Sequence, residues 1–250
     1  MKAAAPKAKP APKSKPAPKS KPARDVKPPA ARDDKPATRD VTGEPWEIKH
    51  ADFVAAAGPG SSLPEHGLEI AFAGRSNVGK SSLINTLTGR KSLVRVGATP
   101  GVTRTLTQFA VQTRAGRSFA LVDLPGYGFA QRSKAERQQW AQLIEHYLRE
   151  REQLVAVVLL VDPRRGVEED DQALVDFVSA PGVGARPPPE LLVVATKIDK
   201  VPRSSSQAVL RAITVPAGLP VIGWSSVTGQ GKSELGRRIS LALERAGSRR

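Results

Sequence analysis

Residues 68–85 read LEIAFAGRSNVGKSSLIN, an apolar run that leads into a glycine-rich turn and then into an amphipathic segment. The turn meets every constrained position of the pattern G-x-x-x-x-G-K-[ST] with Gly74, Arg75, Ser76, Asn77, Val78, Gly79, Lys80 and Ser81. A predicted strand at Leu68–Ala73 and a predicted helix at Lys80–Leu87 give the turn the context that the pattern requires. The backbone N–H groups of such a turn and the positive end of the helix dipole converge on phosphate oxygens. We therefore predict a nucleotide phosphate loop, in which Lys80 reaches the β- and γ-phosphates and the Ser81 hydroxyl binds Mg²⁺.

A carboxylate closes a second predicted strand further along the chain. Residues 119–126 read FALVDLPG and end with Asp123, Leu124, Pro125 and Gly126. A nucleoside triphosphate site needs a second group on the magnesium side, and we assign this role, through a water molecule, to Asp123. Gly126 has no side chain, so its backbone N–H can approach a γ-phosphate and sense whether the phosphate is present.

The segment between these motifs, residues 99–105 with the sequence TPGVTRT, has few residues that could join a core. We expect it to be mobile and to donate a threonine hydroxyl to Mg²⁺ only while a γ-phosphate holds it, which makes an order–disorder switch. Thr103 is the first choice and Thr99 the second, and a plain surface turn is the alternative. The predicted nucleotide-binding residues of this segment are Gly101, Val102, Thr103, Arg104 and Thr105.

A third motif points to guanine as the base. Thr196, Lys197, Ile198 and Asp199 end the apolar run Leu191–Thr196. The Asp199 carboxylate can accept hydrogen bonds from guanine N1–H and the exocyclic amine, whereas adenine offers no matching pair of donors. The Lys197 stem is expected to lie against the purine plane. An ATPase or adenylate-binding kinase that shares only the phosphate loop is the alternative that Asp199 disfavours.

The rest of the chain alternates short apolar runs with longer amphipathic segments, which predicts an α/β domain with a mostly parallel sheet and helices on both faces. Six strands are expected, at Leu68–Ala73, Arg104–Thr113, Arg117–Val122, Leu154–Val161, Leu191–Thr196 and Val221–Trp224. Helices are expected at Lys80–Leu87, Lys134–Arg151, Glu168–Val178, Ser205–Ile213 and Lys232–Ala246. Trp224, Ser225 and Ser226 follow the last strand and are predicted to form a loop whose backbone N–H contacts guanine O6.

The composition divides the 250 residues into two parts. Residues 1–45 carry a net charge of +7 out of a total of +15 and hold 10 of the 22 prolines, without any aromatic residue. This Lys/Pro/Ala-rich stretch cannot build a core, and we predict a disordered basic tail before a folded domain at 46–250. The tail is either an arm that neutralises phosphates or a solubilising extension, and the sequence does not separate the two.

Several classes of protein are excluded by what the chain lacks. Without cysteine there is no disulfide scaffold, no Cys-ligated metal site and no thiol catalysis. No run of about 18 apolar residues and no secretory signal occur, so we expect a cytoplasmic protein without membrane contact. We also expect a monomer that does not bind DNA.

The motifs LEIAFAGRSNVGKSSLIN, ATPGVTRT, DLPGYGFA, TKIDK and WSS, in this order and spacing, resemble the EngB (YihA/YsxC) group of bacterial ribosome-assembly GTPases of the TRAFAC class. The resemblance covers about residues 46–246. It implies a Ras-like P-loop GTPase domain that binds GTP or GDP with Mg²⁺, helps to mature the large ribosomal subunit and supports normal septation at cell division. Carried over, it assigns phosphate binding to Gly74–Ser81, magnesium to Ser81 and Thr103, the γ-phosphate loop to Asp123–Gly126, and guanine binding to Thr196–Asp199 and Trp224–Ser226.

The sequence departs from related GTPases at three places. Val102 and Arg104 flank the switch threonine where the family commonly has a basic residue and Gln, and Tyr127 stands where Ras-type enzymes have a water-orienting Gln. The family resemblance together with Asn77 suggests a bound K⁺ that supplies the charge of an arginine finger, with a structural role in the loop as the alternative for Asn77. The predicted catalytic residues are Lys80, Thr103, Asp123 and Gly126.

Slow intrinsic turnover is expected without the Gln, so the GTP form would act as a timer on a pre-ribosomal particle. Arginines near the C-terminus are candidates for contacts with ribosomal RNA phosphates, namely Arg237, Arg238, Arg245, Arg249 and Arg250. A signalling GTPase that uses protein partners only is the alternative.

Overall fold

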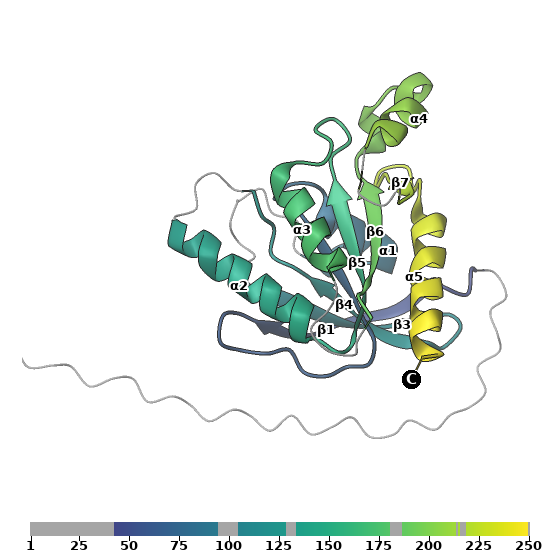
Figure 1. The fold of residues 1–250 in the computed structure, drawn as a ribbon. Helices are drawn as coiled ribbons and strands as arrows, with labels where there is room; N and C mark the ends of the chain where they lie inside the picture. The colour runs from purple at the N-terminus through teal and green to yellow at the C-terminus, as the bar shows by residue number, and fades with distance from the viewer. Residues whose placement is uncertain are drawn as a thin grey trace, which may run out of the picture. The chain divides into compact units, whose positions relative to one another are not determined.

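A computed structural model of the chain describes residues 43–94, 105–128, 134–180, 187–213, 215 and 219–249. Residues 1–42 of the predicted tail and residues 99–104 of the predicted switch lie outside these ranges. The described residues form seven strands and five α-helices (Figure 1).

The sheet has the strand order β1-β3-β4-β2-β5-β6-β7. The strands are β1 (Ile48–Ala57), β2 (Glu69–Gly74), β3 (Leu106–Thr113), β4 (Ser118–Asp123), β5 (Leu154–Val161), β6 (Glu190–Ala195) and β7 (Val221–Gly223). β4, β2, β5, β6 and β7 pair in parallel, whereas β3 pairs antiparallel with both β4 and β1. The predicted α/β class with a mostly parallel sheet is confirmed, and the six predicted strands match to within two residues at each end.

The predicted number of six strands is wrong, because β1 adds a seventh at the edge of the sheet. Its side chains are mostly exposed or half-buried, and only Ala51 and Ala57 of its ten residues are buried. The pairing with β3 also slips between Ile48 and His50 and between Phe53 and Ala55. An exposed, irregular edge strand rich in alanine carries no clear alternation, and so its sequence gave no strand signal.

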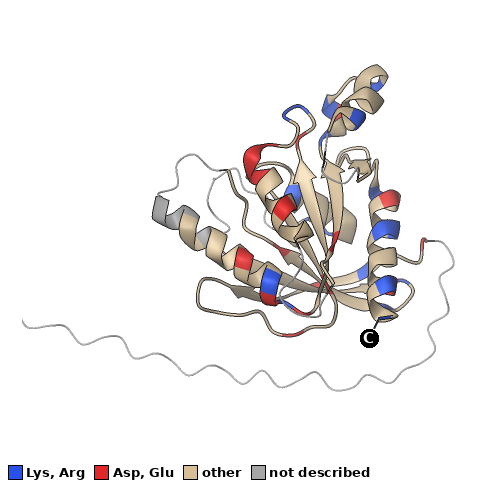
Figure 2. Cartoon of the chain, viewed as in Figure 1, with Lys and Arg blue, Asp and Glu red and all other residues tan. Residues whose placement is uncertain are grey.

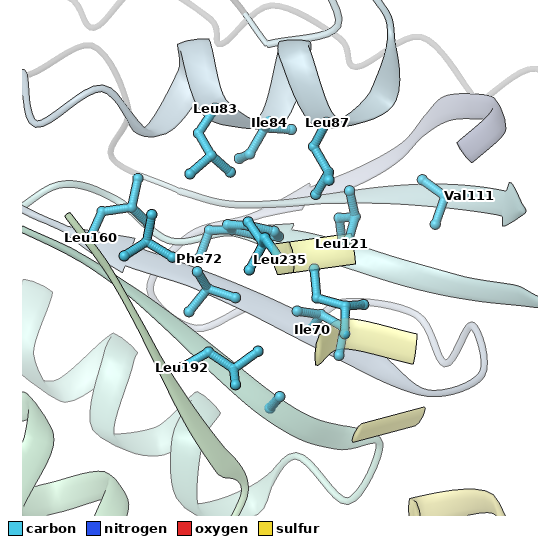
Figure 3. Close-up of a cluster of buried hydrophobic side chains, with 14 of the residues drawn as sticks. Ile70, Phe72, Leu83, Ile84, Leu87, Val111, Leu121, Leu160, Leu192 and Leu235 are labelled. Atoms are coloured by element: carbon cyan, nitrogen blue, oxygen red, sulfur yellow. The ribbon is translucent and has the colours of Figure 1, made fainter. Parts of the chain in front are cut away.

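Helices cover both faces of the sheet (Figure 1). The helices are α1 (Lys80–Thr88), α2 (Lys134–Glu150), α3 (Glu169–Ser179), α4 (Arg203–Ala212) and α5 (Lys232–Gly247). Buried residues of α1 and α5 pack with one face of the sheet, and buried residues of α2 and α3 pack with the other. Figure 3 shows Leu83, Ile84 and Leu87 pointing from α1 towards Phe72 and Leu121 on the strands. None of the helices in the described ranges is both long and apolar enough to cross a membrane.

Successive residues of β2 serve the two faces in turn. Ile70 and Phe72 lie in the cluster under α1 and α5, whereas Ala71 and Ala73 lie in the cluster under α2 and α3, and all four are buried. This double burial explains the continuous apolar run, since a parallel strand that is covered on both faces has no polar side.

The first described residues belong to the same fold. Trp46 is buried and packs on α5 at Gly236, where an added Cβ would lie 2.0 Å from the indole ring. Only glycine leaves room for this contact.

Glu69, at the start of β2, is a fully buried carboxylate that pairs with one guanidinium and accepts further hydrogen bonds from neutral donors. Arg151 donates to it from Nη2 at 2.6 Å and from Nε at 3.0 Å. Tyr147 donates its hydroxyl at 2.9 Å, and Gln108 donates its amide at 2.7 Å. The hydrogen bond with Glu69 raises the pKa of Arg151, so this guanidinium stays charged.

We expect Arg151→Ala to lower the free energy of unfolding by about 3 kcal/mol, because it leaves the Glu69 carboxylate buried without its counter-charge. Urea denaturation followed by circular dichroism measures the change. Arg90→Ala is the control, since the exposed Arg90 lies 3.9 Å from the exposed Asp52, and should change the free energy of unfolding by less than about 0.5 kcal/mol. Equal losses in the two variants would contradict a special role for the Glu69 network.

Candidate nucleotide-binding site

The loop between β2 and α1 lies at the carboxyl ends of the central parallel strands. Gly79 precedes the helix with φ +111°, and Asn77 also has a positive φ, of +64°. Gly74 packs so closely on β5 that a Cβ would lie 2.9 Å from the carbonyl oxygen of Leu160. The loop therefore needs glycine at its first and sixth positions for space and for backbone conformation, while asparagine tolerates the left-handed region at the fourth.

Two predicted site residues contact each other directly. Lys80 and Asp123 form a buried ion pair between the start of α1 and the end of β4. Strand pairing produces the contact, since β2 and β4 are neighbours in parallel register with Phe72 opposite Asp123. The structure thus brings together the predicted phosphate lysine and the predicted magnesium-side carboxylate.

The DLPG segment runs alongside the phosphate loop. Leu124 N–H donates to the Phe72 carbonyl at 3.0 Å, and Ser76 N–H donates to the Tyr127 carbonyl at 2.9 Å. A Cβ on Gly126 would lie 3.1 Å from the Ser76 hydroxyl oxygen. Glycine at position 126 therefore allows a close approach to Ser76, and its backbone lies beside the phosphate loop; its predicted contact with a γ-phosphate stays a prediction.

The loop that carries the predicted guanine-binding residues Thr196–Asp199 also contacts the phosphate loop. The Thr196 hydroxyl donates to the Val78 carbonyl at 2.6 Å, and Lys197 Nζ donates to the Asn77 carbonyl at 2.6 Å. Lys197 has a φ of +55°, and Ile198 N–H donates to the Trp224 carbonyl at 3.1 Å. These bonds fix the stem of Lys197 between two loops, where a purine ring could stack on it.

Asp199 is exposed in a short 3-10 helix at Ile198–Lys200, so its carboxylate is free to face a ligand.

The loop after β7 is more constrained than the sequence indicated. Ser225 N–H donates to the Gln230 carbonyl at 3.1 Å, and its hydroxyl accepts from the N–H groups of Val227 and Thr228. Trp224 is buried, and its indole N–H donates to the Ser226 hydroxyl at 2.9 Å.

These bonds assign structural tasks to Trp224 and Ser225. Among the backbone hydrogen bonds of the described residues, none uses Ser226 N–H. This group is therefore the better candidate for the predicted contact with guanine O6.

Asp162, at the end of β5, is a residue that the sequence analysis missed. Its carboxylate accepts from Arg164 at 2.6 and 2.9 Å and lies 3.6 Å from Lys197 Nζ. The hydrogen bond from Arg164 lowers the pKa of Asp162 to about 2, so the group is a fixed negative charge beside the predicted base lysine. Its place directly after an apolar run was the available signal.

A second missed group joins the phosphate loop to the start of α3. Arg75 pairs with Glu168 at 2.8 Å, and the Tyr127 hydroxyl donates to Asp171 at 2.6 Å. Burial raises the pKa of the Asp171 carboxyl, and the hydrogen bond from Tyr127 only partly offsets this. Figure 2 shows the acidic residues gathered at the start of α3. The run Glu168–Asp171 was the signal in the sequence.

The remaining predicted residues are only partly described. Thr105 is half-buried just before β3, whereas Thr99, Gly101, Val102, Thr103 and Arg104 lie outside the described residues.

The donors fit a magnesium ion that is shared with phosphates. Ser81 is half-buried in the first turn of α1, next in sequence to the lysine that pairs with Asp123. In the described ranges no three His, Cys, Asp or Glu side chains come together as a metal site. One hydroxyl and one carboxylate are hard oxygen donors, and such sites hold Mg²⁺ through the substrate phosphates rather than by a full protein cage.

The comparisons with known proteins agree with this geometry. A family model described as "50S ribosome-binding GTPase" matches residues 69–197. The probable GTP-binding protein EngB of Heliobacterium modesticaldum is 41% identical over 194 residues, which is 76% of this chain and 90% of that protein. The protein of the same name from Alkaliphilus metalliredigens is 45% identical over 174 residues, which is 69% of this chain and 79% of that protein.

Solved structures extend the likeness. The crystal structure of a probable GTP-binding protein engB has a TM-score of 0.53 and 27% identity, and the match covers 71% of this chain and 99% of that one. Aquifex aeolicus Era, crystallised with GDP and aluminium fluoride, has a TM-score of 0.56 over 72% of this chain and 57% of that one, and at 22% identity it supports the fold alone.

Fold and loops together define a Ras-like P-loop GTPase, an enzyme that binds GTP and hydrolyses it to GDP. Within that class, the chain belongs to the EngB family of GTP-binding proteins.

We expect Asp199→Asn to weaken GTP binding by about a hundredfold or more, because an amide cannot accept both guanine donors. Xanthosine triphosphate, which carries an oxygen in place of the exocyclic amine, should bind the variant more tightly than it binds the parent. Competition against a fluorescent guanine nucleotide measures both affinities. Lys200→Ala, in the same short helix, should leave both affinities unchanged. If Asp199→Asn does not alter the preference for guanosine over xanthosine triphosphate, Asp199 does not bind the base.

Proposed function

We propose that this GTPase is a GTP-dependent switch in the assembly of the large ribosomal subunit and that normal septation depends on it. The match to a family described as 50S ribosome-binding supports the partner. We place its action in the cytoplasm, as a monomer without DNA or membrane contact. The observation that carries the proposal is the basic outer face of α5.

That face is suited to phosphate. On α5, Arg237 and Arg245 are exposed and Arg238 is half-buried, and Arg249 is exposed just after the helix ends. Basic residues outnumber acidic ones on α5, where Glu244 lies 3.6 Å from Arg117 and only Arg245 has an acidic partner, Glu190 at 3.0 Å, among the described ion pairs. Figure 2 shows basic and acidic bands along the helix. Guanidinium groups on a rigid helix suit shaped contacts with RNA phosphates.

Within the site we assign the following roles. Gly74–Ser81 hold the phosphates, Ser81, Thr103 and Asp123 hold Mg²⁺, Gly126 N–H senses the γ-phosphate, and Thr196–Asp199 with Ser226 bind guanine. Lys80, Thr103, Asp123 and Gly126 form the catalytic group. Mg²⁺, when bound, neutralises charge on the phosphate oxygens. Lys80 exchanges its contact with Asp123 for the phosphates.

We expect the triple variant Arg237→Ala/Arg238→Ala/Arg249→Ala to bind purified large-subunit precursors more weakly, with a salt dependence reduced by about one unit of slope per arginine. Co-sedimentation across a KCl series with a non-hydrolysable GTP analogue measures both quantities. The matched control removes the exposed Arg90, Arg149 and Arg203 instead.

Equal effects in the two triple variants would show that net charge, and not the α5 face, determines binding. If binding to the large-subunit precursors does not change with salt concentration, a signalling GTPase with protein partners only is favoured. A chain that begins at Gly43, compared with the full chain, tests whether residues 1–42 neutralise RNA phosphates or act as a solubilising extension only.

We also propose that K⁺ near Asn77 replaces the missing arginine finger. Since Asn77 has a left-handed backbone, alanine would strain the loop as well as remove the amide. Asn77→Gly removes only the side chain. GTP hydrolysis by the parent should run faster in KCl than in NaCl, and Asn77→Gly should abolish the difference; equal rates of the parent in both salts would rule out the K⁺ site.

A further inference from the structure

Tyr127 directly follows Gly126, and its side chain is buried against the helices that cover one face of the sheet. Only 5% of the residue is exposed, and its ring lies in the apolar cluster with residues of α2 and α3. The hydroxyl donates to Asp171 Oδ1 on α3 at 2.6 Å. The buried Tyr127 side chain is therefore held by α3 and is not placed to take over the role of the Ras-type Gln.

The backbone of the same residue is held by the phosphate loop. Its carbonyl accepts from Ser76 N–H at 2.9 Å, and Arg75 and Tyr127 form a parallel β-bridge. Gly126, one residue earlier, lies so close to Ser76 that an added Cβ would be 3.2 Å from its backbone nitrogen. Because the two residues are adjacent, the contacts that fix the backbone of Tyr127 also fix the position of the Gly126 N–H.

Asp171 is itself fixed by the start of its helix. Its Oδ2 accepts from Glu168 N–H at 3.0 Å in a capping box. The Glu168 carboxylate in turn pairs with Arg75 at 2.8 Å. The contacts thus form a closed ring from the phosphate loop through α3 to Tyr127 and back to the phosphate loop.

Arg75 closes this ring over Gly128. An added Cβ on Gly128 would lie 2.7 Å from the guanidinium carbon, so a side chain here would displace Arg75. The segment that follows Gly126 is therefore confined on one side by the phosphate loop and on the other by α3.

We propose that Tyr127 and Asp171 are positioning residues of the GTPase: they hold Gly126 beside the phosphate loop, where its N–H can meet a third phosphate, and so set the preference for GTP over GDP. This inference rests on the proposed role of Gly126 as the γ-phosphate sensor. Without the Tyr127–Asp171 hydrogen bond, α3 restrains the segment less, and part of the free energy of GTP binding is spent on ordering Gly126.

The test compares two buried tyrosines that donate to buried carboxylates. Tyr127→Phe removes the hydroxyl from Asp171, whereas Tyr147→Phe removes the same group from Glu69, at the other end of β2 and away from the phosphate loop. Affinities of the full-length protein for GDP and for a non-hydrolysable GTP analogue are measured by titration calorimetry, with single-turnover hydrolysis rates alongside.

We expect Tyr127→Phe to weaken binding of the GTP analogue by about five- to tenfold, the effect of one lost hydrogen bond of ordinary strength, and to leave GDP affinity within about twofold. Single-turnover hydrolysis should slow. Tyr147→Phe should lower thermal stability without changing the ratio of the two affinities. Asp171→Asn, which keeps an acceptor oxygen for Tyr127, should have a smaller effect than Asp171→Leu, and these variants decide the matter if Tyr127→Phe does not fold.

Equal weakening of both nucleotides, or an unchanged ratio in Tyr127→Phe and Asp171→Leu, would overturn the proposal. Gly126→Ala separates this failure from failure of the sensor role. If Gly126→Ala leaves the ratio unchanged, the sensor role and the positioning role both fall. If it alters the ratio while the Tyr127 and Asp171 variants do not, only the positioning role falls.

Discussion

The parallel pairing of β2 with β4 on one side and β5 on the other is the constraint on which the rest of the structure depends. It brings three strand ends to one edge of the sheet and places Lys80, Asp123 and Asp162 there. Parallel strands that are covered on both faces are apolar along most of their length, so polar side chains gather at the strand ends and in the loops beyond them. The site therefore consists of strand ends and helix starts, held by hydrogen bonds between loops.

The fold and much of the site could be predicted from the sequence because their signals are local. The apolar runs of β2, β5 and β6 are continuous, and Gly74 and Gly79 have a spacing that few other structures need. Pairing of Lys80 with Asp123 follows once two such motifs end neighbouring parallel strands. The edge strand β1 was missed for the converse reason, since its exposed residues are fixed only by pairing with β3.

Contacts across the fold were beyond prediction. Nothing local shows that the Tyr127 hydroxyl reaches Asp171, 44 residues away in sequence, or that Glu69 accepts hydrogen bonds from β3, from α2 and from the turn that follows α2. Ser225 and Ser226 looked equivalent in the sequence, and only the turn that follows them gives the first a structural task and leaves the N–H of the second for a ligand. Such roles depend on which elements meet in space, and a single sequence records this weakly.

The packing of Trp46 on Gly236 fixes where the folded unit begins. The indole covers Gly236, a position of α5 that lacks a side chain, so Trp46 belongs to the core as much as any strand does. The folded unit therefore starts before Trp46. A tail exchanged between relatives, or another protein fused to this one, should be joined to the chain at or before Gly43. A junction placed after Trp46 would instead remove the indole and leave Gly236 uncovered on the helix that carries the arginines.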